Sequence, residues 1–223
     1  MDIIKEALDQ GRKTLSEYQS KQLLARYGIP VNEEKLVSSR EKAVEAARDI
    51  GFPVVLKACS SDIIHKTEHN LVEINLRNEN DIIEAYDKVV NNTGESLDGV
   101  LVQEMVPGNR ELVAGLIRDP QFGPCVMFGL GGIYTEILKD VSFRVAPLER
   151  IDALEMINEI KASSILEEFR GQKPVDKEIL CDILMSIGKI GMEIEEIMEI
   201  DVNPLIISKD RPVAVDALVV LKK

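Results

Sequence analysis

The sequence predicts an α+β fold in two α+β halves, residues 1–98 and 99–223, that together make one folded unit. Three observations support this prediction. Capped helical segments and strand-like runs mix in the first half, apolar runs divided by turn residues open the second half, and a hairpin pattern closes the chain. The halves meet near residues 93–99, where the sequence NTGES interrupts the apolar pattern.

Capping residues predict two helices in the first half. Ser16 and Gln19 form a capping box that begins a helix at about residues 17–27. Ser38 and Glu41 begin a second helix in the same way. The remaining elements expected in this half are strands at 54–58 and 71–76 and a helix at 80–92.

The second half begins with short apolar runs that predict a largely antiparallel sheet. The runs cover residues 99–106, 111–118 and 125–130, and the turn pairs Pro107-Gly108 and Asp119-Pro120 divide them. Helical patterns then return between residues 151 and 191. The final segment, with a turn at SKDRP between two strand-like runs, resembles a β-hairpin.

The composition limits the classes of partner. Lys+Arg 27 against Asp+Glu 39 gives a net charge of −12, which argues against a nucleic-acid backbone or an anionic membrane surface. The sequence contains no export signal and no run of about 18 apolar residues, so we expect a cytoplasmic protein. Cys59, Cys125 and Cys181 are odd in number and lie among apolar neighbours, which predicts reduced core thiols.

Two charged residues lie inside predicted strands. Because strand side chains alternate, Lys57 shares a face with Val55 and Cys59. It is either an edge-strand lysine that discourages aggregation or a phosphate-binding lysine in a cleft. Glu104 poses the same question, with a carboxylate at a pocket rim or a salt-bridged carboxylate as the alternative to a functional role.

The last hairpin contains a candidate metal site. Three oxygen donors share one strand face: Glu199, Asp201 and Asn203. A turn centred between Lys209 and Asp210 puts Asn203 opposite Asp216, with Cβ atoms about 4.5–5.5 Å apart. That separation lets both side chains bind one Mg²⁺ at about 2.0–2.1 Å. A solvated acidic strand face is the alternative.

Two weaker signals concern phosphate. The glycine-rich segment GLGGIYTE, residues 129–136, could bring backbone N–H groups near phosphate oxygens, or it could be a tight turn without a ligand. Downstream, Arg144 either contacts phosphate or pairs with a neighbouring acid. We group Arg144 with the candidate nucleotide-binding residues.

Both histidines of the chain lie in HKTEH, residues 65–69. His65, Glu68 and His69 have the order of an inverted zinc-protease motif. About twelve residues with little helical periodicity separate the flanking strands, and no third ligand is evident, so a zinc site is disfavoured. The open interpretations are an imidazole that attacks phosphorus and a solvated surface group.

Longer motifs resemble a known family. SEYQSKQLLARYGIPV resembles the opening of the succinyl-CoA synthetase β-subunit family. The further motifs are GFPVVLKA, DIIHKTE, LVQEMVPGNRELVAGLIRDPQFGP, MFGLGGIYTEILKDVSFRVAPL, FRG and EIDVNPLI. Together, over nearly the whole chain, they resemble the β subunits of ADP-forming acetyl-CoA synthetases, an ATP-grasp family.

The resemblance implies an ATP-grasp fold, in which two α+β lobes enclose a nucleotide cleft with Mg²⁺ at the phosphates. In that family pattern Lys57 would contact phosphate or adenine. Glu104 and Val106 would form the adenine-side hinge, and Glu111 would lie near the ribose.

The resemblance also implies roles for the histidine and the metal pair. Asn203 and Asp216 match the family's metal ligands, which is the pair that the hairpin register selects. His65 matches a histidine that accepts a phosphoryl group from an alpha subunit and delivers it to ADP. His69 has no counterpart and is interpreted as a surface residue. Asn70 and Leu71 stand where the family usually has two glycines, and leucine disfavours a positive φ.

The implied activity is that of an acid–CoA ligase. Acetyl-CoA, ADP and phosphate would give acetate, ATP and CoA. The chain lacks a CoA-binding Rossmann pattern, so it would need an alpha subunit, in an α2β2 complex. Two alternatives are a carboxylate–amine ligase of the same fold and a nucleotide-binding regulatory subunit without chemistry.

Overall fold

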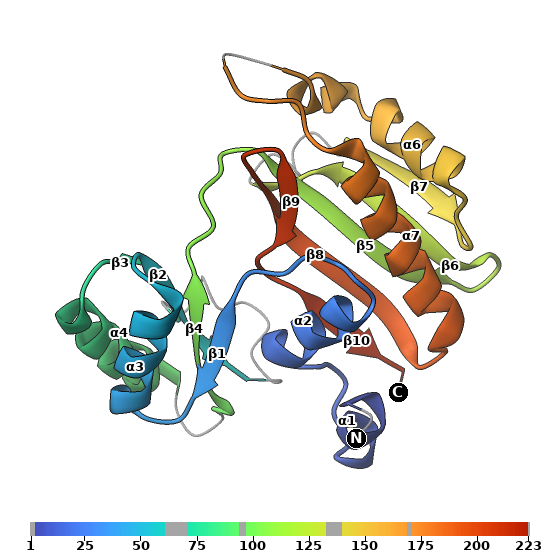
Figure 1. The fold of residues 1–223 in the computed structure, drawn as a ribbon. Helices are drawn as coiled ribbons and strands as arrows, with labels where there is room; N and C mark the ends of the chain where they lie inside the picture. The colour runs from blue at the N-terminus through green and yellow to red at the C-terminus, as the bar shows by residue number, and fades with distance from the viewer. Residues whose placement is uncertain (1–2, 61–70, 94–96, 133–139, 169–170, 223) are drawn as a thin grey trace. The chain divides into compact units, whose positions relative to one another are not determined.

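The computed structural model describes residues 3–60, 71–93, 97–132, 140–168 and 171–222 (Figure 1). The chain forms two compact units. The smaller unit consists of Ser16–Tyr18 and Asn32–Met105, and the larger unit consists of Met1–Leu15, Gln19–Val31 and Val106–Lys223. None of the helices in the described ranges has the length and apolar character needed to span a membrane.

In its described residues, the smaller unit contains a four-stranded antiparallel sheet (Figure 1). The strand order is β1-β4-β2-β3. The strands are β1 (Glu34–Val37), β2 (Val54–Cys59), β3 (Val72–Leu76) and β4 (Gly99–Glu104). Since β2 is an interior strand, its backbone pairs with a neighbouring strand on each side, β4 and β3.

Two helices, α3 (Arg40–Ile50) and α4 (Glu79–Thr93), pack against each other on one face of this sheet (Figure 1). Alanines and branched apolar residues of both helices form one core with the apolar face of β2 and β4. The oxygen of Ser39 accepts a hydrogen bond from the Lys42 backbone N–H. The N-cap of α3 is therefore Ser39, and the predicted cap, Ser38, was wrong by one residue.

The described residues of the larger unit contain a six-stranded sheet of order β10-β8-β5-β6-β7, with β9 also paired to β8. All of these pairings are antiparallel, which confirms the predicted sheet type. The strands are β5 (Glu111–Asp119), β6 (Gly123–Leu130), β7 (Val141–Val145), β8 (Ile197–Ser208), β9 (Arg211–Ala214) and β10 (Leu218–Leu221).

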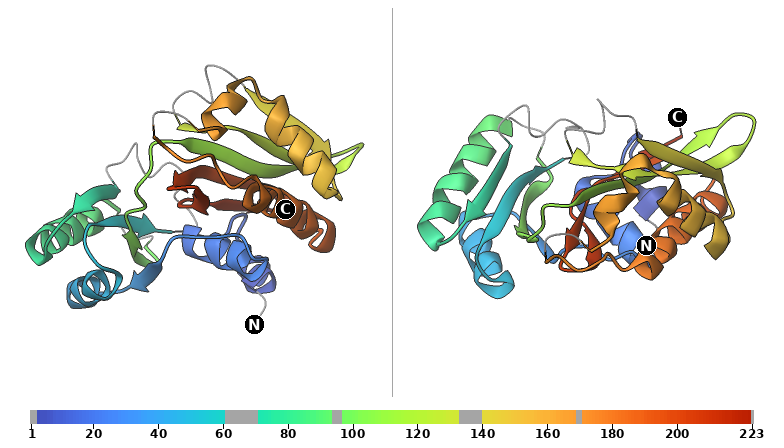
Figure 2. Two further views of the ribbon diagram at one scale, coloured as in Figure 1. Left: turned by 45° about the horizontal axis from the view of Figure 1, so that its top comes forward. Right: turned by 90° about the horizontal axis from the view of Figure 1, so that it is seen from above.

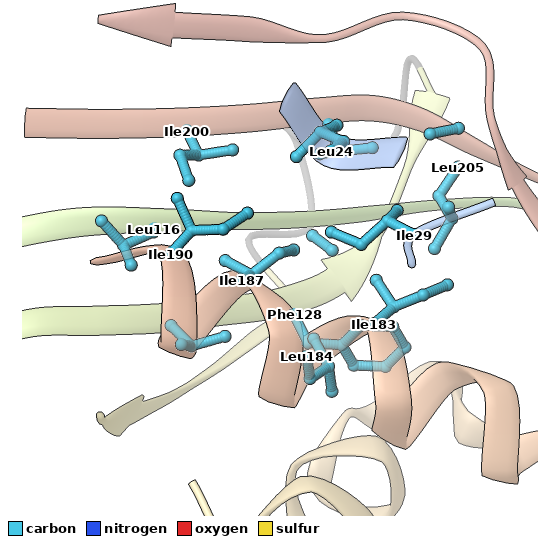
Figure 3. Packing of buried hydrophobic residues seen from close by; sticks show 14 of the residues in the cluster. Leu24, Ile29, Leu116, Phe128, Ile183, Leu184, Ile187, Ile190, Ile200 and Leu205 are labelled. Atoms are coloured by element: carbon cyan, nitrogen blue, oxygen red, sulfur yellow. The ribbon is translucent and has the colours of Figure 1, made fainter. Parts of the chain in front are cut away.

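The helices α6 (Arg150–Glu159) and α7 (Lys177–Glu193) pack side by side on one face of this larger sheet (Figure 2). A short 3₁₀ helix, η3 (Lys161–Leu166), follows α6. Apolar side chains of α7 meet those of β5, β6 and β8 in the core (Figure 3). At Gly191 a Cβ atom would lie 2.3 Å from Leu116 Cδ1, so glycine is what allows the end of α7 to approach β5 this closely.

The N-terminal helices are α1 (Ile3–Asp9) and α2 (Glu17–Arg26). Leu24 of α2 and Ile29 after it belong to the same core cluster as Leu205 of β8 (Figure 3). The Leu15 backbone N–H also donates to the Val219 carbonyl of β10 at 3.0 Å. Most of the N-terminal segment therefore belongs to the larger unit.

This division differs from the expected halves, 1–98 and 99–223. Residues 99–104 form β4, which pairs with β1 and β2, so the chain leaves the smaller unit after residue 105. Two further differences are local. The charged run that forms β1 was not predicted as a strand, and VAVDALVVL is split into β9 and β10.

Candidate functional site

In the smaller unit, Lys57 of β2 is nearly buried and paired with a carboxylate. Its Nζ atom lies 2.9 Å from Oε1 of Glu17, and the two side chains are 10% and 1% exposed. Leu56 and Ala58 lie in the core that the helices cover, so Lys57 is on the other face, as predicted. Because β2 is interior, the edge-strand interpretation of Lys57 is wrong.

Gln103 of β4 holds the same carboxylate from a second side. Its Nε2 atom donates to Glu17 Oε1 at 2.6 Å and to Glu34 Oε2 at 2.8 Å. Gln103 is 1% exposed and pairs with Glu34 in the β1–β4 register. Charged groups in such buried places are stable only when paired and hydrogen-bonded. Glu17 was not singled out from the sequence, because 40 residues separate it from Lys57.

The predicted adenine-side residues lie where the two units join along the chain. Glu104 ends β4, is exposed, and accepts a hydrogen bond from the Glu33 backbone N–H at 3.4 Å. Val106 is half-buried and is the first residue of the following part of the larger unit. The boundary after residue 105 therefore falls inside the predicted hinge, and adenine contact by either residue stays a prediction.

In the larger unit, β9 and the first three residues of β10 pair with β8 in one common register, which shifts only at Leu221. The pairs that flank the candidate metal site are Leu205 with Ala214 and Asp201 with Leu218. This register puts Asn203 opposite Asp216, in the short segment between β9 and β10. The Val215 N–H also donates to the Pro204 carbonyl at 3.2 Å. The predicted register is confirmed, and metal binding by the pair stays a prediction.

Asp201 lies beside this pair on the same strand. Burial, together with the smaller effects of the negative charges of Glu199 and Asp216, raises the pKa of Asp201 to about 6. In the part of the chain that the structure describes, no three His, Cys, Asp or Glu side chains form a metal-binding group. Carboxylate and amide oxygens are nevertheless the donors that Mg²⁺ prefers, with substrate phosphates as further ligands. The donor chemistry of Asn203 and Asp216 fits this cation.

Glu111 and the glycine-rich segment come together at the start of β5. The Gly131 N–H donates to the Glu111 carbonyl at 2.9 Å. Gly132 has φ +73, and a Cβ atom there would lie 2.7 Å from Glu111 Oε2. The Glu111 carboxylate therefore lies directly against the Gly132 backbone. Residues 133–136 of the glycine-rich segment lie outside the described residues.

Arg144 lies on the opposite face of the larger sheet from Asp201. It pairs with Val126, whose side chain is in the core under the helices, whereas Asp201 belongs to the other face. Its guanidinium lies 2.9 Å from Glu159 and 3.7 Å from Glu155, both on α6. Of the two interpretations of Arg144, the structure supports pairing with a neighbouring acid. It does not bring Arg144 together with the other candidates.

The histidine segment HKTEH, residues 65–69, lies outside the described residues, as does Asn70. The zinc, reactive and surface interpretations of His65 and His69 therefore stay predictions. The three cysteines are free thiols, with Cys59 and Cys181 buried and Cys125 half-buried, in agreement with the expected reduced state.

Comparison with known proteins places these features in a family. The ATP-grasp domain family matches residues 6–221 of the chain. The β subunit of acetate–CoA ligase [ADP-forming] I from Pyrococcus furiosus is 48% identical, over 99% of this chain and 97% of that subunit. Acetate–CoA ligase [ADP-forming] I from Archaeoglobus fulgidus is 40% identical over 99% of this chain, which corresponds to 33% of that longer protein.

Solved structures agree with this relationship. Acetyl-coenzyme A synthetase 1 of Ca. Korarchaeum cryptofilum, in complex with coenzyme A, Ca-AMPCP and HgCl+, is 46% identical with a TM-score of 0.95 over 99% of both chains. The same synthetase with coenzyme A and Mg-AMPPCP, and with its phosphohistidine segment pointing towards the nucleotide-binding site, gives a TM-score of 0.89 at the same identity and coverage. These findings confirm the fold and the family that the sequence motifs implied. The chain belongs to the ATP-grasp family and, within it, to the β subunits of ADP-forming acetate–CoA ligases.

Proposed function

We propose that this chain is the nucleotide-binding β subunit of an ADP-forming acetyl-CoA synthetase and that His65 delivers a phosphoryl group to ADP. The observation that supports this most is the similarity to β subunits of this enzyme along nearly the whole chain. The Korarchaeum structures, with a phosphohistidine segment and bound nucleotide analogues, make the same chemistry reasonable for this relative.

The residues of this chain have separate roles in the proposed reaction. Lys57 donates to a phosphate oxygen of the nucleotide, while Glu104 and Val106 contact adenine and Glu111 lies near the ribose. Neutral His65 attacks phosphorus through a ring nitrogen and takes the phosphoryl group from the alpha subunit, whose own bond to phosphorus breaks. The new N–P bond then breaks as a terminal oxygen of ADP bonds to phosphorus. The imidazole leaves neutral and ready for another cycle.

Asn203 and Asp216 would hold Mg²⁺ through amide and carboxylate oxygens. When bound there, Mg²⁺ would neutralise phosphate charge, a large part of catalysis in phosphoryl transfer. The opposed register of the two residues on β8 and the β9–β10 segment supports this assignment. Arg144 is left out of the proposed site because it pairs with α6 on the other sheet face.

The proposed partner is an alpha subunit with the CoA-binding and acyl-phosphate sites, in an α2β2 complex. The Archaeoglobus relative, in which this chain corresponds to 33% of one longer protein, supports a partner of larger size. Co-expression with such a chain, followed by measurement of the mass of the complex, tests this part of the proposal. A β chain that completes the reaction alone would reject it.

Labelling with γ-³²P-ATP and Mg²⁺ tests the role of His65. We expect an acid-labile label on the wild-type chain that His65→Asn removes. His69→Asn is the matched control, because it changes the other histidine of the chain and is expected to keep the label. With the alpha partner, His65→Asn is expected to lower turnover more than about a thousandfold.

Each alternative function predicts a different outcome. A label that persists in His65→Asn would reject the proposed transfer. Full activity of His65→Ala on a carboxylate and an amine would identify a carboxylate–amine ligase. Nucleotide binding without any label, even with the alpha partner present, would identify a regulatory subunit.

A further inference from the structure

The pair of Glu17 and Lys57 points to a role that the family relationship does not assign. We propose that Glu17 is a positioning residue, which holds the ammonium of Lys57 where a phosphate oxygen of a nucleoside di- or triphosphate binds. The inference rests on the proposed function, because it assumes that Lys57 binds nucleotide. Glu17 itself does not contact the nucleotide in this proposal.

Burial is the first argument. The Lys57 side chain is 10% exposed and the Glu17 side chain is 1% exposed. An ammonium taken this far out of water needs a partner, and a carboxylate at 2.9 Å favours its charged form. Glu17 therefore supplies the opposite charge and the hydrogen-bond acceptor that an ammonium in this buried place needs.

The fixed position of Glu17 is the second argument. Its Oε1 atom accepts from Lys57 at 2.9 Å and from Gln103 at 2.6 Å. Gln103 is itself held by Glu34, its direct partner across β1 and β4. The Glu17 carboxylate is thus hydrogen-bonded to side chains of two interior strands of one sheet, β2 and β4. Lysine has four rotatable bonds, so such an anchor determines where its Nζ atom lies.

The number of donors on lysine makes the two bonds compatible. An ammonium group has three N–H donors, so a bond to Glu17 is consistent with a bond to a phosphate oxygen. A paired lysine carries little net charge together with its partner. We therefore expect Glu17 to act on the geometry of nucleotide binding, and so on the affinity for nucleotide, more than on the rate of transfer.

Four versions of the full chain test the proposal: wild type, Glu17→Gln, Lys57→Met and the double variant. The affinity for Mg-ADP is measured by isothermal titration calorimetry. Glu17→Gln is expected to weaken binding about tenfold, the effect of losing one hydrogen bond to a charged group. Lys57→Met is expected to weaken it at least as much. In the Lys57→Met background, Glu17→Gln is expected to add nothing, because Glu17 acts through Lys57.

Glu73→Gln is the matched control. It makes the same chemical change in another lysine-paired carboxylate of the same sheet, on β3, whose partner is Lys88 and not Lys57. We expect an affinity for Mg-ADP within about twofold of wild type. A purely structural role of Glu17 would lower the folded fraction and the apparent turnover, while the KM for ADP of the folded molecules stayed the same.

The outcomes separate this inference from the proposed function. A wild-type chain that does not bind Mg-ADP rejects both. The positioning role alone is rejected if wild type binds Mg-ADP normally and Lys57→Met binds weakly, but Glu17→Gln binds as well as wild type. It is also rejected if Glu17→Gln causes the same loss of affinity in the wild-type and Lys57→Met backgrounds. If Glu17→Gln does not fold, Glu17→Asp serves instead, because it keeps the charge but withdraws the carboxylate by one methylene. Unchanged Mg-ADP affinity in Glu17→Asp would likewise overturn the proposal.

Discussion

Asn203 of β8 lies opposite Asp216 in the register that β8 shares with β9 and β10. Asp216 itself lies in the segment between β9 and β10, outside both strands. The interruption of strand pairing at this point has a consequence for ligands. An amide and a carboxylate side chain lie at opposed positions where the ladder between β8 and the outer segment is interrupted between β9 and β10. This arrangement suits a cation site in the larger unit.

The first prediction concerns this pair. Asp216→Asn is expected to weaken Mn²⁺ binding to the chain, followed by electron paramagnetic resonance, at least about tenfold in the presence of ADP. The reason is that the substitution replaces the anionic carboxylate of the pair by a neutral amide, whose oxygen is a weaker ligand for a divalent cation. Glu195→Gln, a change of an exposed carboxylate in the turn before β8, is the control. Equal Mn²⁺ affinity in Asp216→Asn and wild type would contradict a metal site here.

A second prediction follows from the contact of Gly132 with Glu111. Gly132→Ala is expected to lower the free energy of unfolding by about 1–2 kcal/mol through its positive φ and, in addition, to displace the Glu111 carboxylate. Mg-ADP affinity is then expected to fall. Gly123→Ala is a close control, because Gly123 has φ +77 but no atom within 4 Å of an added Cβ. It should show the backbone effect in urea unfolding and normal Mg-ADP affinity, and a similar loss of affinity in both variants would argue against a role for Glu111.

The third prediction tests whether Arg144 pairs with acidic residues, as in the structure, or contacts nucleotide phosphate, as the sequence alone also allowed. Because its guanidinium pairs with Glu159 and Glu155 on the helix-covered face, Arg144→Met is expected to change Mg-ADP affinity by less than about twofold. The loss of a partly exposed ion pair is expected to cost about 0.2–1 kcal/mol in the free energy of unfolding. A tenfold loss of Mg-ADP affinity would show that Arg144 reaches the nucleotide after all.

A fourth prediction concerns the pH dependence of stability. The folded-state pKa of Asp201 is about 6, above its ordinary value of 3.8, so the folded chain binds this proton more tightly than the unfolded chain. Stability from this group therefore falls as pH rises from about 4 to about 6. Asp201→Asn is expected to raise the free energy of unfolding, by up to about 3 kcal/mol at pH 7.5 and by about 1 kcal/mol at pH 4.5.

Urea unfolding of the chain in EDTA at both pH values checks this. Glu195→Gln, which changes an exposed carboxylate, is expected to give no such difference between the two pH values. If Asp201→Asn gave the same stability change at pH 4.5 and 7.5, the carboxyl group would have an ordinary pKa in the folded chain.

Local patterns in the sequence predicted much of the fold. The turn at 209–210 set the register of the last hairpin, because the flanking runs alternate and Lys209 takes a positive φ of 62° there. The capping box at Ser16 placed the start of α2 correctly. The predicted N-cap of α3, Ser38, differs from the observed one, Ser39, because two adjacent serines precede that helix and either side chain could cap it.

Features that depend on contacts between distant segments were not predictable in the same way. Nothing near Glu17 in the sequence indicates that its carboxylate meets Lys57 and Gln103, which are 40 and 86 residues away. For the same reason, the side of the sheet on which Arg144 lies became known only from its pairing with Val126. The division into units also depends on sheet pairing, which placed β4 with β1 and β2.

The path of the chain through its two hydrophobic cores has a consequence for biosynthesis. Residues 32–105, which make up nearly all of the smaller unit, are translated before any residue of the larger sheet. This segment can therefore form its own hydrophobic core during translation, at a time when the strands that α1 and most of α2 pack against have not yet been synthesised. The N-terminal helices can pack only after β8 and β10 have been synthesised, and these strands lie at the end of the chain. We therefore expect the larger unit to assemble later than the smaller one on the nascent polypeptide.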